Sequence, residues 1–171
     1  MTLDRVGIIA TRQCVIDTFK GLRDDLLKVF GTLEPSLKED RSVVTEWDVK
    51  VEDTLRKALE KEFPDIGFVG EETGKHGNEK TYWLVDPIDG TNSFVRGIPT
   101  CTNMAALIDD GQVVASVIYD FIQDKLYTAI KGEGAFCNDE KISVNTTREP
   151  GSFIAYALSS ITKFGLLQEA G

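Results

Sequence analysis

The sequence of 171 residues has few of the side chains that indicate a disulfide scaffold, a zinc site or histidine chemistry. Its three cysteines, Cys14, Cys101 and Cys137, are far apart and form no CxxC pair, so neither a disulfide framework nor a thiolate zinc site is indicated. A reducing cytoplasm is the compartment that this usage predicts. His76 is the one histidine, which excludes mechanisms that need several. The apolar runs are far shorter than the ~20 residues of a membrane-spanning helix, and no signal peptide is expected.

Basic residues are also scarce, since 19 Lys and Arg stand against 28 Asp and Glu, for a net charge of −9. A nucleic-acid partner is therefore not expected, because neutralising phosphates takes a basic face. A small anionic substrate remains compatible, because a bound divalent cation reverses the local field. With 42% apolar and 27% charged residues, the chain has the composition of a folded domain.

Hydrophobic spacing predicts two long helices. Apolar residues over 6–30 recur at spacings of three, four or seven, which is typical of an amphipathic helix. A second helix is expected over 51–63, with Thr45 and Asp48 at the positions of capping residues. The polar segment 34–41 between the two helices is expected to be an exposed loop.

Short apolar or β-branched runs then predict a series of strands, at 67–70, 81–85, 104–108, 113–119, 125–129 and 135–137. The dipeptide at 110–111, Asp-Gly, indicates a tight hairpin turn. Two helices followed by a meander favour an α+β fold, with the helices packed on an antiparallel sheet, over a doubly wound parallel one. We expect this domain to span residues 1–150 and residues 151–171 to begin a second domain that the sequence does not complete.

The densest group of carboxylates follows two of the predicted strands. Glu71 comes directly after one apolar run, and Asp86 and Asp89 come after the next. If those strands lie side by side, the three carboxylates converge and cannot all stay ionised without a counter-charge. Ligands that are all oxygen favour Mg²⁺ or Mn²⁺ over zinc, and the backbone carbonyl of Ile88 adds a further oxygen.

The residues after Asp89 are suited to hold a phosphate. Gly90 lets the backbone approach an anion closely, and the hydroxyl of Thr91 can orient a water molecule. A short helix over 90–96 would present N–H groups to the phosphate. A metal beside an anion-binding turn predicts metal-assisted hydrolysis of a phosphate ester, with a metal-bound hydroxide as nucleophile.

Each of these residues also has a purely structural interpretation. Asp86 and Asp89 would fit a polar turn after a strand. Asp48 would fit a helix cap, and Thr91 would fit a turn hydroxyl.

Four segments, taken in order, resemble the motifs of the inositol monophosphatase family of magnesium-dependent phosphatases. They are VVTEWD (43–48), VGEETG (69–74), WLVDPIDGTNSFVRGIP (83–99) and YDFIQDKLYTAIKGEGAFCN (119–138). The resemblance covers roughly residues 6–143, and it implies the first half of a layered α/β/α/β/α sandwich, whose sheet is covered by two long helices.

The resemblance also implies roles for individual residues. The metal ligands would be Glu71, Asp86, the carbonyl of Ile88, and Asp89. Thr91 would help Glu71 to activate the attacking water, and Asp48 would approach the metal and water from the second helix. The phosphate would face the turn formed by Ile88, Asp89, Gly90, Thr91 and Asn92.

The sequence departs from the family at its end, because it lacks the second half and the WDxAAG-like motif whose aspartate completes the metal site. We therefore expect an amino-terminal portion of a Mg²⁺-dependent phosphatase of small phosphate monoesters, either inositol monophosphate-like or fructose bisphosphate. The alternative is a non-catalytic fragment with an incomplete metal shell, which binds metal weakly or needs a partner half. Self-association through an exposed sheet face is a further expectation.

Overall fold

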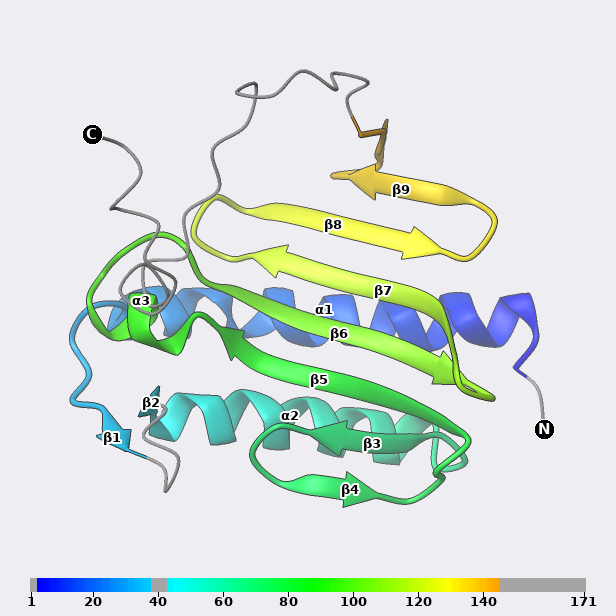
Figure 1. The fold of residues 1–171 in the computed structure, drawn as a ribbon, viewed down its shortest axis with the longest axis horizontal. Helices are drawn as coiled ribbons and strands as arrows, with labels where there is room; N and C mark the ends of the chain where they lie inside the picture. The colour runs from blue at the N-terminus through cyan, green and yellow to red at the C-terminus, as the bar shows by residue number, and fades with distance from the viewer. Residues whose placement is uncertain (1–2, 38–42, 145–171) are drawn as a thin grey trace, which may run out of the picture.

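The computed structural model describes residues 3–37 and 43–144 (Figure 1). Its helices are α1 (Arg5–Val29), α2 (Glu46–Glu62) and α3 (Thr91–Val95). A two-stranded sheet pairs β1 (Ser36–Leu37) with β2 (Val43–Val44). The main sheet contains β3 (Gly67–Gly70), β4 (Gly74–His76), β5 (Thr81–Asp89), β6 (Thr102–Asp109), β7 (Gln112–Asp120), β8 (Lys125–Ile130), β9 (Gly134–Cys137) and β10 (Glu140–Ile142). The predicted domain boundary at 150 and the second-domain segment 151–171 lie outside the described residues.

The main sheet has the strand order β10-β9-β8-β7-β6-β5-β3-β4. The predicted α+β fold with two long helices on this sheet is confirmed, and its neighbouring strands are antiparallel except for β3 and β5, which are parallel. The parallel pair arises because β4 turns the chain back beside β3 before β5 begins. β4 lies in a polar, glycine-containing segment without apolar alternation, so the sequence pattern did not indicate it.

Both long helices begin at side chains that cap them. Asp4 Oδ1 accepts a hydrogen bond from the Gly7 amide at 2.7 Å at the start of α1. The predicted capping residues of the second helix are confirmed, since Thr45 and Asp48 form a reciprocal capping box at the start of α2. Of the exposed loop predicted over 34–41, Ser36 and Leu37 are exposed but form β1, which pairs with β2, and residues 38–41 lie outside the described residues.

The core lies between the two long helices and one face of the main sheet. Its largest fully buried side chains include Phe19, Leu26, Leu55, Leu59, Phe68, Trp83, Leu107 and Tyr119. The indole Nε1 of Trp83 donates to the Thr11 hydroxyl at 2.9 Å, so even the polar atom of this central residue is bonded across to α1. None of the helices within the described residues is long and apolar enough to cross a membrane.

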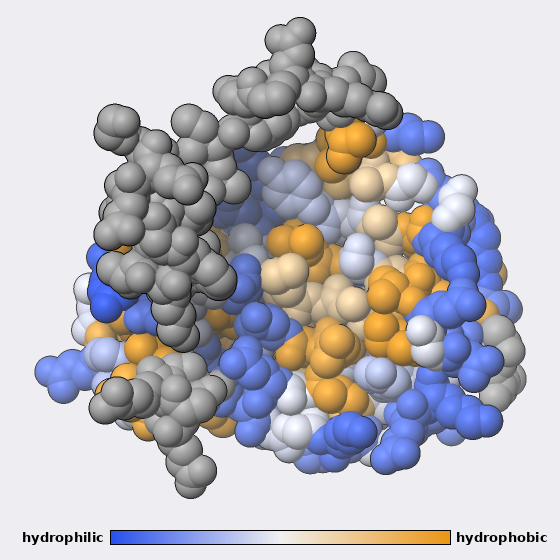
Figure 2. All heavy atoms as spheres, viewed as in Figure 1, coloured by the Kyte–Doolittle hydropathy of each residue, from blue (hydrophilic) through white to orange (hydrophobic). Residues whose placement is uncertain are grey.

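The opposite face of the sheet, which we call the open face, is turned away from α1 and α2 (Figures 1 and 2). Cross-strand pairing places Leu84, Ala106 and Ala129 in one row and Met104, Ile118 and Tyr127 in the next. Figure 2 shows the apolar residues gathered over the centre of this face. Leu84 is 47% exposed although it lies in the middle of β5. The sheet therefore presents apolar surface on both sides, and the described helices cover one of them.

Candidate metal centre and phosphate turn

The acidic residues of the predicted metal centre lie at the ends of the two parallel strands. Gly70, the last residue of β3, pairs in register with Val85 of β5, so Glu71 and Asp86 leave the two strands at equivalent positions. In Figure 1 the ends of β3 and β5, helix α3 and the start of α2 lie toward the same end of the molecule. The parallel pairing is thus what brings together acids that are 15 residues apart in sequence.

Asp86 is surrounded by other carboxylates. Its pKa is raised from 3.8 to about 7, first by burial and then by the negative charges of Glu71, Asp89 and Asp48. A hydrogen bond with the side chain of Glu71 raises it further, because one of the two carboxyl groups must carry the proton. Asp86 therefore lies close enough to Glu71 and Asp89 for their negative charges to act on it, while the role of the three as ligands stays a prediction.

Glu71, Asp86 and Asp89 lie near one another, but their side chains are not arranged as a complete metal site. Within residues 3–37 and 43–144, no three His, Cys, Asp or Glu side chains are grouped closely enough to hold a metal ion. The donor chemistry nevertheless fits a hard divalent cation, because four acidic groups and a backbone carbonyl are all oxygen ligands and their mutual repulsion calls for positive charge. A cation at this place would replace the proton that Asp86 shares with Glu71.

A β-bulge separates Asp86 from Asp89. The register of β5 against β6 shifts between these two residues, so β5 contains one more residue than the facing part of β6. Asn103 of β6 is fully buried, and its Nδ2 donates to the carbonyl of Pro87 at 2.6 Å. The amide thus bonds a carbonyl within the bulge and fixes the separation of the two aspartates.

The bulge continues into the glycine turn that was predicted to face phosphate. Gly90 has the left-handed backbone torsion φ 85°, and the amides of Ser93 and Phe94 donate to its carbonyl to start α3. A Cβ atom at Gly90 would lie 2.6 Å from the carbonyl oxygen of Thr100, so a side chain has no room there. The predicted short helix over 90–96 is confirmed as α3.

Asp48 and Thr91 connect this turn to α2. Thr91 Oγ1 lies 3.0 Å from Asp48 Oδ1 and 3.0 Å from the carbonyl oxygen of Ile88, so it can donate its single proton to either. The other oxygen of Asp48 accepts bonds from the amide and hydroxyl of Thr45 at the helix start. Burial raises the pKa of Asp48, against the opposing effect of these hydrogen bonds. The carboxylate that caps α2 therefore also contacts Thr91, while its predicted approach to the metal stays a prediction.

The other predicted phosphate residues are placed differently. Asp89 is exposed at the end of β5 and Asn92 is exposed on α3. The side-chain oxygen of Asn92 accepts a hydrogen bond from Arg96 at 3.1 Å, so it is directed along the helix. The backbone carbonyl of Ile88 is next to Thr91, while the Ile88 side chain is buried in the core.

Two polar residues that contact these turns were not predicted from the sequence. Asn103 and Glu52 are both fully buried, and Glu52 accepts hydrogen bonds from the residues directly after Glu71. The sequence contained a signal for each residue. Asn103 interrupts the apolar run of β6, and Glu52 lies on the apolar stripe of α2, where polar side chains are uncommon.

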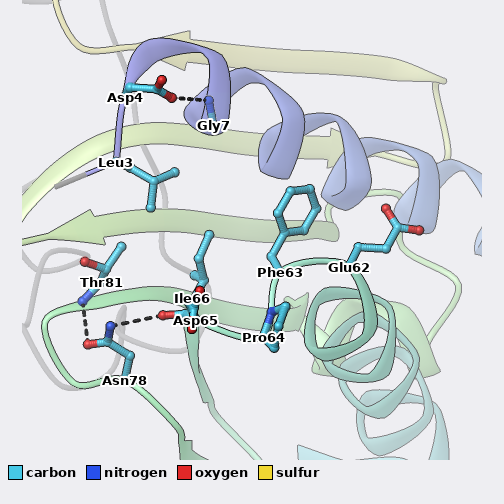
Figure 3. Close-up of a pocket in the computed structure, with 10 residues that line it drawn as sticks. All are labelled: Leu3, Asp4, Gly7, Glu62, Phe63, Pro64, Asp65, Ile66, Asn78 and Thr81. Carbon is cyan, nitrogen blue, oxygen red and sulfur yellow. Dashed lines mark hydrogen bonds between the residues drawn. The ribbon is translucent and has the colours of Figure 1, made fainter. Parts of the chain in front are cut away.

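A separate cavity of about 620 Å³ lies at the other end of the molecule (Figure 3). Residues at the start of α1, the end of α2 and the approach to β5 line it, among them Leu3, Phe63, Ile66 and Asn78. The predicted metal and phosphate residues do not line this cavity. It is therefore not part of the candidate site.

Comparison with known proteins agrees with the fold and the motifs. The model of the inositol monophosphatase family matches residues 13–168, so the chain belongs to the inositol monophosphatase family. It is 38% identical over 140 residues to the inositol-1-monophosphatase of Rhizobium meliloti, and the aligned region covers 80% of this chain and 52% of that protein. It is 35% identical over 118 residues to Nus factor SuhB of Xylella fastidiosa, and the aligned region covers 69% of this chain and 43% of that protein.

A solved structure shows the same fold. The extragenic suppressor protein suhB from Bartonella henselae superposes with a TM-score of 0.75 at 35% identity, covering 81% of this chain and 55% of that one. The chain thus spans about half the length of the curated relatives it matches. The resemblance expected from the motifs is confirmed at the level of the family.

Proposed function

We propose that this chain carries the metal-ligand half of a phosphatase that hydrolyses small phosphate monoesters with Mg²⁺, or with Mn²⁺ in its place. The observation that carries the proposal is the parallel pairing of β3 with β5, which places Glu71 and Asp86 at equivalent strand ends, where burial and the charges of Glu71, Asp89 and Asp48 raise the pKa of Asp86. Glu71, Asp86, Asp89 and the carbonyl of Ile88 would hold the cation. The family membership supports a phosphoric ester as the substrate class.

The chain's own residues would supply the orientation and the proton acceptor. A bound divalent cation would neutralise the phosphate charge and lower the pKa of a coordinated water. The Thr91 hydroxyl, held beside Asp48, would orient that water, and Glu71 would accept its proton. The turn from Gly90 to Asn92 would face the phosphate, because the left-handed Gly90 turns the chain directly into the start of α3.

The direct test is phosphate release from inositol monophosphate, with fructose bisphosphate as the second substrate, in the presence of Mg²⁺. We expect release above a metal-only blank and a fall of about 10²–10³-fold for Asp89→Asn, because one ligand charge is lost. Asp110→Asn is the matched control, since this acid lies in the distant β6–β7 turn with φ 48°, a conformation that asparagine tolerates. An unchanged rate in Asp89→Asn would contradict the assigned role.

A non-catalytic fragment is the second candidate function. The observation behind it is the spacing of the acids, since no three His, Cys, Asp or Glu side chains in the described part of the chain are grouped closely enough to hold a metal ion. Cation binding without turnover would support this candidate. Turnover above the blank would exclude it.

The open face is proposed to bind a second copy of this chain. Exposed apolar patches of this kind are rare on monomers. In a two-fold dimer the same patch of both copies is buried, so this contact would cover the open face. Size-exclusion chromatography is expected to show a dimer or larger species that Leu84→Lys converts to monomer, because the lysine places a charge in the apolar rows. Val6→Lys is the control, since Val6 is exposed on α1 away from the sheet. A wild-type monomer would contradict the proposal.

A further inference from the structure

Glu52 is a buried carboxylate whose two oxygens contact the turn that carries Glu71. It lies in α2, one helical turn after Asp48, and its exposed fraction is 0%. Oε2 accepts a hydrogen bond from the amide of Glu72 at 2.9 Å, and Oε1 accepts one from the amide of Thr73 at 2.7 Å. Oε1 also accepts a hydrogen bond from the hydroxyl of Thr73. Both oxygens of the carboxylate are therefore bonded to the two residues that follow Glu71.

Gly70 shows how closely the carboxylate fits against the end of β3. A Cβ atom on Gly70 would lie 2.0 Å from Oε1 and 2.5 Å from Oε2 of Glu52, a separation that side chains do not tolerate. The backbone of β3 must therefore lack a side chain at this position for Glu52 to reach the turn. Gly70 of β3 and Glu52 of α2 are thus packed against each other directly before Glu71.

The burial of the Glu52 side chain needs an explanation, because burying a carboxylate is costly unless its oxygens are hydrogen-bonded. Its hydrogen bonds supply one. Bonds from N–H and O–H groups to an ionised carboxylate are roughly twice as strong as neutral ones. Glutamine, a neutral residue of the same size, replaces one of these acceptor oxygens by an NH2 donor, so it cannot give each of the two amides an oxygen of its own.

We infer that Glu52 is a positioning residue for the metal centre: through Glu72 and Thr73 it holds the turn that carries Glu71 beside Asp86 at the ends of β3 and β5. Asp48, one helical turn earlier, contacts Thr91 on the other turn. One face of α2 thus holds both turns of the site, and Glu52 does so without touching the cation. This inference rests on the proposed function, because a cation site is what makes the position of Glu71 matter.

The test combines Mn²⁺ binding to the 171-residue chain, followed by electron paramagnetic resonance, with amide hydrogen exchange. We expect Glu52→Gln to raise the dissociation constant for Mn²⁺ by about 10–100-fold, the usual effect of losing a residue that orients a ligand. Exchange at Glu72 and Thr73 is expected to accelerate, while the amides of α2 keep their protection. Glu60→Gln is the matched control, because Glu60 lies on the same helix in an exposed ion pair with Arg56.

Thr73→Val removes one of the three hydrogen bonds and leaves the carboxylate in place, so it is expected to cause a smaller loss of Mn²⁺ affinity. An unchanged affinity in folded Glu52→Gln, or unchanged exchange at Thr73, would overturn the positioning role and leave the proposed function standing. Should Glu52→Gln fail to fold, an unchanged affinity in Thr73→Val would overturn the role instead. A wild-type chain that binds no Mn²⁺ would refute the proposed site itself.

Discussion

Replacing Asp86 by asparagine is expected to stabilise the cation-free protein and to abolish its stabilisation by Mg²⁺. In the folded chain the Asp86 carboxyl has its pKa raised from 3.8 to about 7, so the folded state binds this proton more tightly than the unfolded state does. Stability therefore falls as the pH rises from about 4 to about 7, and the cost is fully present above pH 7. Asparagine carries no charge and removes that cost.

The gain in stability is expected to be about 1 kcal/mol at pH 8, or roughly 2–4 °C in Tm, because solvent at this half-buried group screens part of the repulsion. Thermal melts in chelator at pH 8 and pH 4 measure it, and the gain should disappear at pH 4. With Mg²⁺ at about 100 times its Kd, the wild type should gain roughly 2.7 kcal/mol and the variant nothing. Equal Mg²⁺ shifts in both proteins would contradict the role of Asp86, as would a lower Tm for the variant in chelator.

Gly90→Ala is expected to destabilise the protein by about 2–4 kcal/mol and to disorder the turn that is proposed to face phosphate. The substitution combines two costs: a left-handed backbone for alanine, and a Cβ atom 2.6 Å from the carbonyl oxygen of Thr100. Urea unfolding measures the loss. Phosphate release, if the wild type shows it, should fall with it, because Thr91 directly follows Gly90.

Gly111→Ala is the matched control for this variant. Gly111 has φ 75° in the hairpin between β6 and β7, and a Cβ atom there would meet nothing within 4 Å. The control therefore carries the backbone cost alone, roughly 1 kcal/mol. Equal losses in the two variants would show that the close approach of Thr100 to Gly90 does not constrain the turn.

Most of the secondary structure follows from local patterns. The apolar spacing predicted α1 and α2, and the Thr45 and Asp48 signal placed the start of α2 correctly. The Asp-Gly dipeptide at 110–111 predicted the β6–β7 hairpin, because both residues tolerate the positive φ angles found there. Local sequence was sufficient for these elements because caps and tight turns depend on neighbouring residues.

What the sequence did not indicate depends on contacts between distant segments. The parallel pairing of β3 with β5 requires β4, whose three residues carry no apolar alternation. Convergence of Glu71 and Asp86 could be expected only on the condition that their strands are neighbours. Glu52 has no motif of its own, since its role lies in a contact with a turn 20 residues further along. The roles of the predicted ligands stay predictions.

The central claim is that the acids at the ends of β3 and β5 form one cation site. Paramagnetic broadening by Mn²⁺ is its most direct test. The chain has 28 acidic residues, so binding must be located as well as detected. In amide spectra at substoichiometric Mn²⁺, we predict that Glu71, Asp86, Asp89 and Thr91 broaden first. Broadening that instead begins at Asp4 and Asp65, at the far cavity, or that spreads evenly over the acidic residues, would contradict the claim.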